Sequence, residues 1–308
     1  MSRDAALDIA KGIGIVLVIV GHCSGIPYWP VRHLIFSFHM PLFFLIGGYL
    51  YREKGVWESL KKDFFRLGLP YLATCLIILL YFLVTSLWTG NYGIVRHYLS
   101  ATCWGSGTLH KCRYLADVPS IGAIWFLPAL LICKNVYNVL PVRNRLVVSS
   151  IIFVLATIIG RYLIYLPFSA LSALSAIVFY AIGDRLKTVR KIPAWGWGIG
   201  LVCWFLSLKY SRIFIVQPQL DLYFVDVIGA TTAALLVYLI AMRISRMGGI
   251  SAFFQWLGAE SLLILCLHLI DMNCGITNRF FTQTSIPFMF LSVLLPVSGA
   301  FVLSWLRR

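Results

Sequence analysis

Long stretches of apolar residues recur along the chain, separated by short polar segments. Within the stretches, Leu, Ile, Val and Phe follow one another without the strict apolar and polar alternation that is typical of half-buried β-strands. A helix needs about 20 mostly apolar residues to cross the hydrocarbon core of a membrane. Ten stretches come close to that length or reach it, at residues 5–24, 32–51, 67–88, 121–140, 146–166, 168–184, 193–209, 222–242, 250–270 and 285–305.

The pattern predicts an all-α fold, a polytopic transmembrane bundle of about ten helices. The composition supports this, because 60% of the residues are hydrophobic and 12% are charged, whereas a soluble domain carries roughly 25% charged residues. Helices are favoured over a barrel because each helix satisfies its own backbone hydrogen bonds in lipid. We expect one membrane-embedded domain over residues 1–308, with no further extracytoplasmic domain.

The formal net charge of +15 could indicate a nucleic-acid partner, but the distribution of Lys and Arg argues against one. The basic residues form short clusters in alternate gaps between the apolar stretches and at the C-terminus. If the N-terminus is cytoplasmic, the cytoplasmic side carries about twice as many Lys and Arg as the other side. The positive-inside rule then predicts that both termini are cytoplasmic. Basic side chains on that side can also contact anionic lipid headgroups.

The longest segment expected outside the membrane, 89–120, holds Cys103 and Cys112. The two lie close enough in sequence for a local disulfide if that side is oxidising. Two free thiols fit the sequence equally well, so the alternatives stay open.

Ionisable residues inside apolar stretches are costly and mark candidate functional sites. Asp8 and Lys11 lie three residues apart in the first stretch, so they share a helix face and can form an ion pair. His22 follows Lys11 by 11 residues, which is about three helical turns and roughly 16 Å along the axis. One face would then present an ammonium group near the cytoplasmic end and an imidazole near the outer end. The structural alternative is an ion pair that reaches the interface and a histidine that caps the helix.

Two other stretches carry histidine. His39 precedes Pro41 in the second stretch, where it could face His22 from an antiparallel helix or donate to a nearby carbonyl. His268 lies near the outer end of the ninth stretch, at a depth similar to that of His22. Asp226 and Asp271 fall close to the outer interface, where solvated roles would suffice.

Residues 4–54 resemble the N-terminal region of the membrane acyltransferase family 3, in which a basic residue is followed after ten residues by His. The segments that carry the resemblance are Asp8-Ile9-Ala10-Lys11-Gly12-Ile13-Gly14-Ile15, Val20-Gly21-His22, Phe38-His39-Met40-Pro41-Leu42-Phe43-Phe44 and Gly47-Gly48-Tyr49. Many members have Arg where this chain has Lys11, which keeps the charge but lacks the planar fork that binds phosphate bidentately. Weaker matches follow in the same order at Arg66 to Pro70-Tyr71, Trp125-Phe126-Leu127, Gly183, and Gly258 through Ser261 to His268.

The resemblance implies an enzyme of the bacterial cytoplasmic (inner) membrane. Such an enzyme transfers an acyl group, commonly acetyl from acetyl-CoA, to a hydroxyl of a sugar, a glycan or a lipid-linked saccharide. The acceptor, the acyl chain length and the oligomeric state stay open.

The chemistry of this reaction assigns roles to the residues above. A hydroxyl that attacks a thioester needs a general base, and imidazole has a suitable pKa, so His22 is the candidate. Lys11, oriented by Asp8, and more weakly Arg66 could bind the anionic part of CoA. His39 or His268 could stabilise the oxyanion or relay the acyl group, and a covalent acyl-histidine is a further possibility.

Two other functions compete with acyl transfer. Buried His, Lys and Glu in ten spans would also suit a proton-coupled transporter or a saccharide exporter, although the symmetric Gly/Pro breaks typical of such proteins are missing from the sequence. A structural or sensory membrane protein would not explain the face that carries Lys11 and His22. The His and Cys residues lack ligand spacing, so the sequence predicts no metal site.

Overall fold

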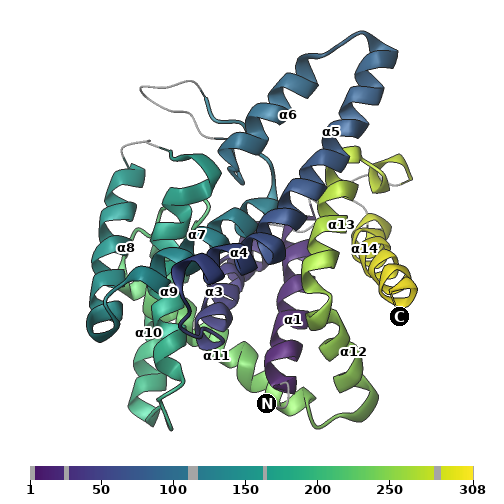
Figure 1. Ribbon diagram of the computed structural model, residues 1–308. Coiled ribbons are helices and arrows are strands. Elements are labelled where there is room, and N and C mark those ends of the chain that lie inside the picture. Colours follow the sequence, from purple (N-terminus) through teal and green to yellow (C-terminus); the bar gives the residue numbers. More distant parts are fainter. Residues whose placement is uncertain (1–3, 24–27, 110–116, 162–164, 281–285, 308) are drawn as a thin grey trace.

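The computed structural model describes residues 4–23, 28–109, 117–161, 165–280 and 286–307. These residues form helices joined by turns (Figure 1), which confirms the all-α prediction. Cys112, and with it the pairing considered for Cys103, lies outside the described residues. The first half of the chain holds α1 (Ala5–His22), α2 (His33–Phe36), α3 (His39–Tyr49), α4 (Val56–Asp63), α5 (Leu69–Thr89), α6 (Gly93–Trp104) and α7 (Phe126–Val139). The second half holds α8 (Arg145–Arg161), α9 (Ala170–Leu186), α10 (Ala194–Tyr210), α11 (Phe224–Ile244), α12 (Gly248–Ala259), α13 (Ser261–Cys274) and α14 (Ile286–Leu306).

Each of the ten apolar stretches coincides with a helix or a pair of helices. Seven helical spans among the described residues are long and apolar enough to cross a membrane, or eight if the bent pair of α12 and α13 counts as one. The stretch at 193–209 forms α10, which has 17 residues and is therefore shorter than these spans. The stretch at 121–140 forms a similarly short apolar helix, Ala123–Val139. The chain is accordingly a multi-pass membrane protein.

The second and ninth stretches are broken rather than continuous. The second divides at Ser37 and Phe38 into α2 and α3, and Pro41 lies in the first turn of α3, where an amide has no intrahelical partner to lose. The ninth bends by 67° between α12 and α13. At this bend the Ser261 hydroxyl donates to the carbonyl oxygen of Gly258, at 3.0 Å.

The helices differ in how much of their surface is buried. In α9, 67% of the span is buried inside the molecule, and in α1 61%, whereas α14 buries only 17% of its span. The outward surface of α5 is apolar, with Val84, Leu87 and Trp88 exposed. A protein that meets water would not leave so large an apolar surface exposed. Helices α1 and α9 therefore form the interior, and α5 and α14 face lipid.

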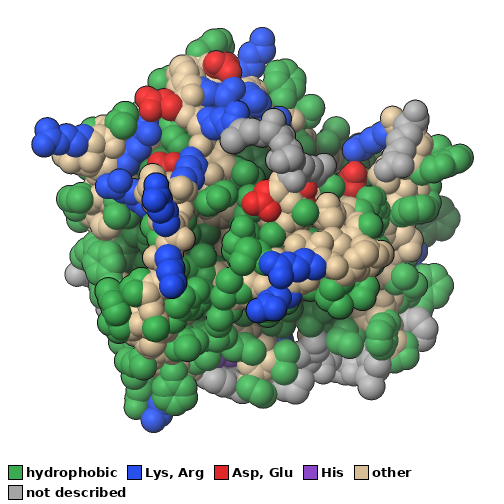
Figure 2. Space-filling model, turned by 90° about the horizontal axis from the view of Figure 1, so that it is seen from below, with side chains coloured by type: hydrophobic (Ala, Val, Ile, Leu, Met, Phe, Trp, Pro, Cys, Tyr) green, Lys and Arg blue, Asp and Glu red, His purple; other side chains and the backbone are tan. Residues whose placement is uncertain are grey.

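Lys and Arg side chains gather at one end of the bundle. Figure 2, the view from below Figure 1, shows many of them on the face from which α1 begins. We call this end the basic end. Helix α1 starts there because the Asp4 carboxylate accepts hydrogen bonds from the backbone N–H groups of Ala6 and Leu7, at 2.9 and 3.3 Å.

Two helix pairs are in backbone contact where glycines face a neighbouring carbonyl. A Cβ atom placed on Gly258 of α12 would lie 1.7 Å from the carbonyl oxygen of Asp8 in α1, and one on Gly12 would lie 2.4 Å from that of Phe254. Between α3 and α9, a Cβ atom on Gly48 would lie 1.9 Å from the carbonyl oxygen of Tyr180. Small residues permit this close packing in membranes.

Asp226 and Asp271 are buried, and the expectation that both are solvated at the interface is wrong. Asp226 accepts hydrogen bonds from the Ser211 hydroxyl at 2.7 Å and from the Leu222 N–H at 2.9 Å. Asp271 accepts from the N–H and the hydroxyl of Thr277. Such donors replace water for the oxygens that they contact, whereas Oδ1 of Asp226 has no hydrogen-bond partner among the described residues.

Replacing Gly258 with Ala should destabilise the protein by about 1–3 kcal/mol, because the new methyl group meets backbone and no side-chain rotation can relieve the overlap. The midpoint of thermal unfolding in detergent measures this. Gly198→Ala in α10 is the matched control, because a Cβ atom there has nothing within 4 Å. The control should keep or slightly raise the midpoint. Equal midpoints for the two variants would contradict the close contact of α1 and α12.

Candidate functional site

A cavity of about 220 Å³ lies between α1, α3, α7 and α13. Most of its wall is apolar, and Lys11 is the charged residue that lines it. The other lining residues are Ile15, Val18, Met40, Phe43, Ile46, Gly47, Leu50, Leu67, Ala123, Phe126, Leu127, Leu130, Ser261, Leu262 and Leu265. We call it the central cavity.

The central cavity runs along the helix axes. On α1 it is lined by Lys11, Ile15 and Val18, which follow one another at spacings of four and three and so form one helix face. Helix α3 runs in the opposite direction and lines the cavity from Met40 to Leu50. The end with Lys11 is the basic end, and the end with Val18 and Met40 lies one turn from the histidines.

His22 continues the face formed by Lys11, Ile15 and Val18, four residues beyond Val18. It lines a second, smaller cavity of about 70 Å³ together with His268, Asp271, Thr277 and Ser292, among others. Along the axis, Lys11 and His22 are about 16 Å apart. The two cavities therefore follow one face of α1 in sequence, with the ammonium group in the first and the imidazole in the second.

The local hydrogen bond of His22 fixes which ring nitrogen can act as a base. Its Nδ1 lies 2.7 Å from the carbonyl oxygen of Val18. Because a carbonyl only accepts, Nδ1 of the neutral ring carries the hydrogen and Nε2 carries the lone pair. The ring also lies edge-on to His268, with 6.1 Å between ring centroids, and 5.9 Å from Phe36.

His268 is 2% exposed, and neither of its ring nitrogens has a hydrogen-bond partner among the described residues. Buried polar groups are nearly always paired, and an unpaired one calls for an explanation. Because His268 borders the small cavity beside His22, its free nitrogens are available to a ligand in that cavity.

His39 is buried and joins the other two histidines through an aromatic contact. Its Nδ1 lies 2.9 Å from the carbonyl oxygen of Ile35. Its ring is 5.1 Å from that of Phe36, which also contacts His22. Gly21 makes room for Phe36, because a Cβ atom on Gly21 would lie 2.7 Å from the Phe36 ring. The structure thus brings the three predicted histidines together at one end of the central cavity.

At the other end, the Lys11 ammonium lies 2.7 Å from the Asp8 carboxylate. The Lys11 side chain is 23% exposed and the Asp8 side chain 5%. Arg66 lies apart from this pair, with an exposed side chain in the π-helical turn Phe64–Gly68. Its neighbour Leu67 lines the central cavity.

Arg66 belongs to a group of cations outside the central cavity. Lys54 and Lys62 both interact electrostatically with it. Lys54 also forms an ion pair with Glu58, at 2.5 Å. We call Lys54, Lys62 and Arg66 the basic cluster; it lies outside the cavity near Leu67, at the end where Lys11 lies.

Sequence reasoning missed the role of Arg32 beside the histidines. Its Nε donates to the carbonyl oxygen of Gly21 at 2.8 Å, and its guanidinium carbon lies 5.5 Å from the centroid of the Phe36 ring. Arg32 therefore holds the last turn of α1 and brings a positive charge close to His22. The sequence does not indicate these contacts, because Arg32 is a single basic residue at the start of an apolar stretch.

Within the described residues, no group of three or more His, Cys, Asp or Glu is arranged to hold a metal ion. The three histidines contact one another through ring edges and Phe36 rather than converging on a common point.

Comparison with known protein families matches residues 4–305 to the family described as Acyltransferase domain. The nodulation protein NolL of Mesorhizobium japonicum is 33% identical over 156 residues, which are 47% of this chain and 38% of that protein. NolL of Sinorhizobium fredii is 32% identical over 139 residues, which are 42% of this chain and 34% of that protein. The match therefore spans well under half of either relative. No solved structure gives a significant match.

Replacing Lys11 with Met should destabilise the protein by about 1–3 kcal/mol, because it removes the ammonium group that pairs with the buried Asp8 carboxylate. The double variant Asp8→Asn/Lys11→Met removes both charges and should recover part of this loss. Thermal unfolding of both variants in the same detergent measures the difference. A double variant that is less stable than Lys11→Met would show that the ion pair is not what Lys11 contributes.

Proposed function

Since the chain belongs to the membrane acyltransferase family 3, we propose that it is an O-acyltransferase. It moves an acyl group, with acetyl as the favoured case, from acyl-CoA to a hydroxyl of a sugar, a glycan or a lipid-linked saccharide. The family assignment favours this enzyme over the transporter and the structural protein that the sequence left as alternatives.

The single observation that supports the proposal is the face of α1 that runs along two cavities, from Lys11 to His22. The distance of about 16 Å is comparable with the length of an extended pantetheine arm. The apolar central cavity suits the arm, and the small cavity suits the thioester and the hydroxyl that attacks it. Acyl-CoA would thus enter at the basic end with its thioester next to His22.

His22 acts as the general base. Its Nε2, which carries the lone pair, takes the proton from the acceptor hydroxyl while the hydroxyl oxygen bonds to the thioester carbonyl carbon. When the carbon–sulfur bond breaks, His22 returns this proton to the departing thiolate. The products are the ester and free CoA, and the protein ends in the protonation state in which it began.

His268 is a better candidate than His39 for stabilising the oxyanion. A donor must already point to where the negative charge develops. Neither ring nitrogen of His268, at the edge of the small cavity, has a partner among the residues that the structure describes. His39 has one nitrogen already engaged with Ile35. The charge of Arg32, close to His22, adds to the positive potential at this end.

The basic cluster and Lys11 bind the anionic end of the donor. The phosphates of CoA would meet Lys54, Lys62 and Arg66 at the mouth, and Lys11, oriented by Asp8, would lie deeper. This requires the basic end to face the cytoplasm, where acyl-CoA is made, so both termini are cytoplasmic and the enzyme lies in the bacterial inner membrane. The acceptor is then acylated near the opposite face.

His22→Ala should lower the rate of acyl transfer about 10²–10⁴-fold, the usual contribution of a general base, while the protein stays inserted and folded. The assay uses purified protein, labelled acetyl-CoA and a panel of sugars and glycans, with release of CoA thiol as a second readout. His97→Ala is the matched control, because His97 is exposed on α6 far along the chain from the site. Full activity of His22→Ala would rule out the mechanism, and sugar uptake without acylation would favour a transporter.

Replacing Lys62 and Arg66 together with Gln should raise the KM for acetyl-CoA and leave kcat nearly unchanged, because these cations contact the donor far from the thioester. The difference from the unmodified protein should shrink as salt is added, since exposed charges are screened. The control is Arg143→Gln/Arg246→Gln, which removes two exposed cations elsewhere. An equal KM change in both double variants would argue against a specific phosphate site.

A further inference from the structure

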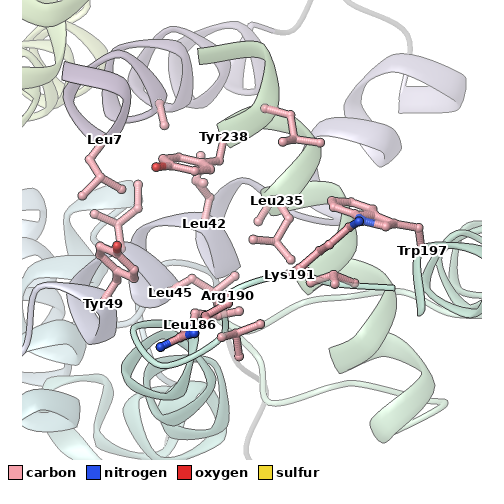
Figure 3. Close-up of a pocket in the computed structure, with 16 residues that line it drawn as sticks. Leu7, Leu42, Leu45, Tyr49, Leu186, Arg190, Lys191, Trp197, Leu235 and Tyr238 are labelled. Carbon is pink, nitrogen blue, oxygen red and sulfur yellow. The ribbon is translucent and has the colours of Figure 1, made fainter. Parts of the chain in front are cut away.

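A larger cavity of about 510 Å³ borders α1 and α3, as the central cavity does, and shares Ile46 with it. Its wall comes from α1, α3, the end of α9, α10, α11 and the segment that follows α9. Figure 3 shows Leu7, Leu42, Leu45 and Leu235 around it, with Arg190 and Lys191 also among the residues that border it. We call it the lateral cavity.

The lining of the lateral cavity is amphipathic. Its inner wall is built of leucine, isoleucine and alanine side chains, which offer no hydrogen-bonding group to a polar solute. Its polar groups are the hydroxyls of Tyr49 and Tyr238, the indole N–H of Trp197, and the two adjacent cations. Tyr and Trp side chains typically mark the membrane–water interface. A ligand that satisfies both parts must carry an apolar chain and a polar head.

The charge of that head follows from Arg190 and Lys191. Both side chains are exposed, and neither forms an ion pair within the described residues, whereas Lys187, in the same segment, is paired with Asp184 at 2.6 Å. The Asp4 carboxylate lies near Tyr238 but is engaged by the first N–H groups of α1. The two cations are therefore free to bind an anion.

We propose that the lateral cavity binds one anionic glycerophospholipid from the leaflet at the basic end. The phosphate contacts Arg190 and Lys191, and one acyl chain fills the cavity between α1, α3 and α11. The lipid is not the acyl acceptor, because Leu7 and Ala10 of this cavity lie roughly 18–22 Å along α1 from His22.

The position of this lipid links it to the reaction site. Ile46 lines both the lateral and the central cavity, and Leu7 and Ala10 lie on α1 beside Asp8 and Lys11. An acyl chain in the lateral cavity would therefore support the wall that carries the Lys11 end of the central cavity. A direct binding measurement tests the lipid site independently of acyl transfer.

The experiment compares phosphatidylglycerol with phosphatidylcholine, using native mass spectrometry of the full-length protein released from detergent with each lipid added. Phosphatidylglycerol should bind to the unmodified protein in preference to phosphatidylcholine. Arg190→Gln/Lys191→Gln should weaken phosphatidylglycerol binding about 10- to 30-fold, as expected for the loss of two cations next to one phosphate. The control Arg143→Gln/Arg246→Gln should bind like the unmodified protein.

Further arms of the experiment separate the chain from the head. Ala234→Phe fills the cavity from α11 and should weaken phosphatidylglycerol binding without changing the surface charge. Inorganic phosphate alone should not compete at concentrations that leave the protein folded. Equal binding of both lipids, or no difference between the two double Gln variants, would overturn the proposal. Competition by free phosphate would also overturn it, because it would assign the cations to a soluble anion.

Discussion

The contact between α1 and α12 determines where the rest of the site can lie. Gly12 and Gly258 bring the two backbones together with no side chain between them, so α1 is fixed at the basic end of the bundle. The chain then bends by 67° and continues as α13, which packs less closely on α1 than α12 does. The central cavity lies on α13 from Ser261 to Leu265, directly after the bend. A straight helix in place of α12 and α13 would continue the close contact and leave no space beside Lys11.

The buried polar groups divide the molecule into two ends with different properties. At the basic end buried carboxylates are paired with lysines, as Asp8 is with Lys11 and Asp63 with Lys134 at 2.5 Å. These pairs satisfy charges that lipid cannot solvate and require no ligand to explain them. At the histidine end, His268 is buried, and its ring nitrogens have no hydrogen-bond partner in the part of the chain that the structure describes. Because an unpaired buried polar group costs free energy, a ligand in the small cavity would gain by pairing with this ring.

Hydropathy alone predicts the positions of the helices well, because crossing lipid imposes a length and a composition that can be counted along the chain. The shared face of Lys11 and His22 follows equally from helical spacing. The bend after α12 could not be predicted, since an apolar stretch has the same composition whether straight or broken. The burial of Asp271 also could not be predicted, because its donor Thr277 lies beyond the helix in a separate turn. The position of Arg32 could not be predicted either, because it depends on how the chain returns toward Gly21.

Helix α1 borders both the lateral and the central cavity. A helix makes fewer side-chain contacts where it lines a cavity, so its position depends more on contacts elsewhere. At the basic end these are the Asp4 cap and the backbone contact at Gly258; at the other end, Arg32 donates to the carbonyl oxygen of Gly21. Because Lys11 and His22 lie on one helix, the helical rise sets their spacing, and the contacts at both ends hold that helix in place beside the cavities. A fixed spacing is what a site needs if it must hold a long donor by its anionic end and present a single reactive bond at the other.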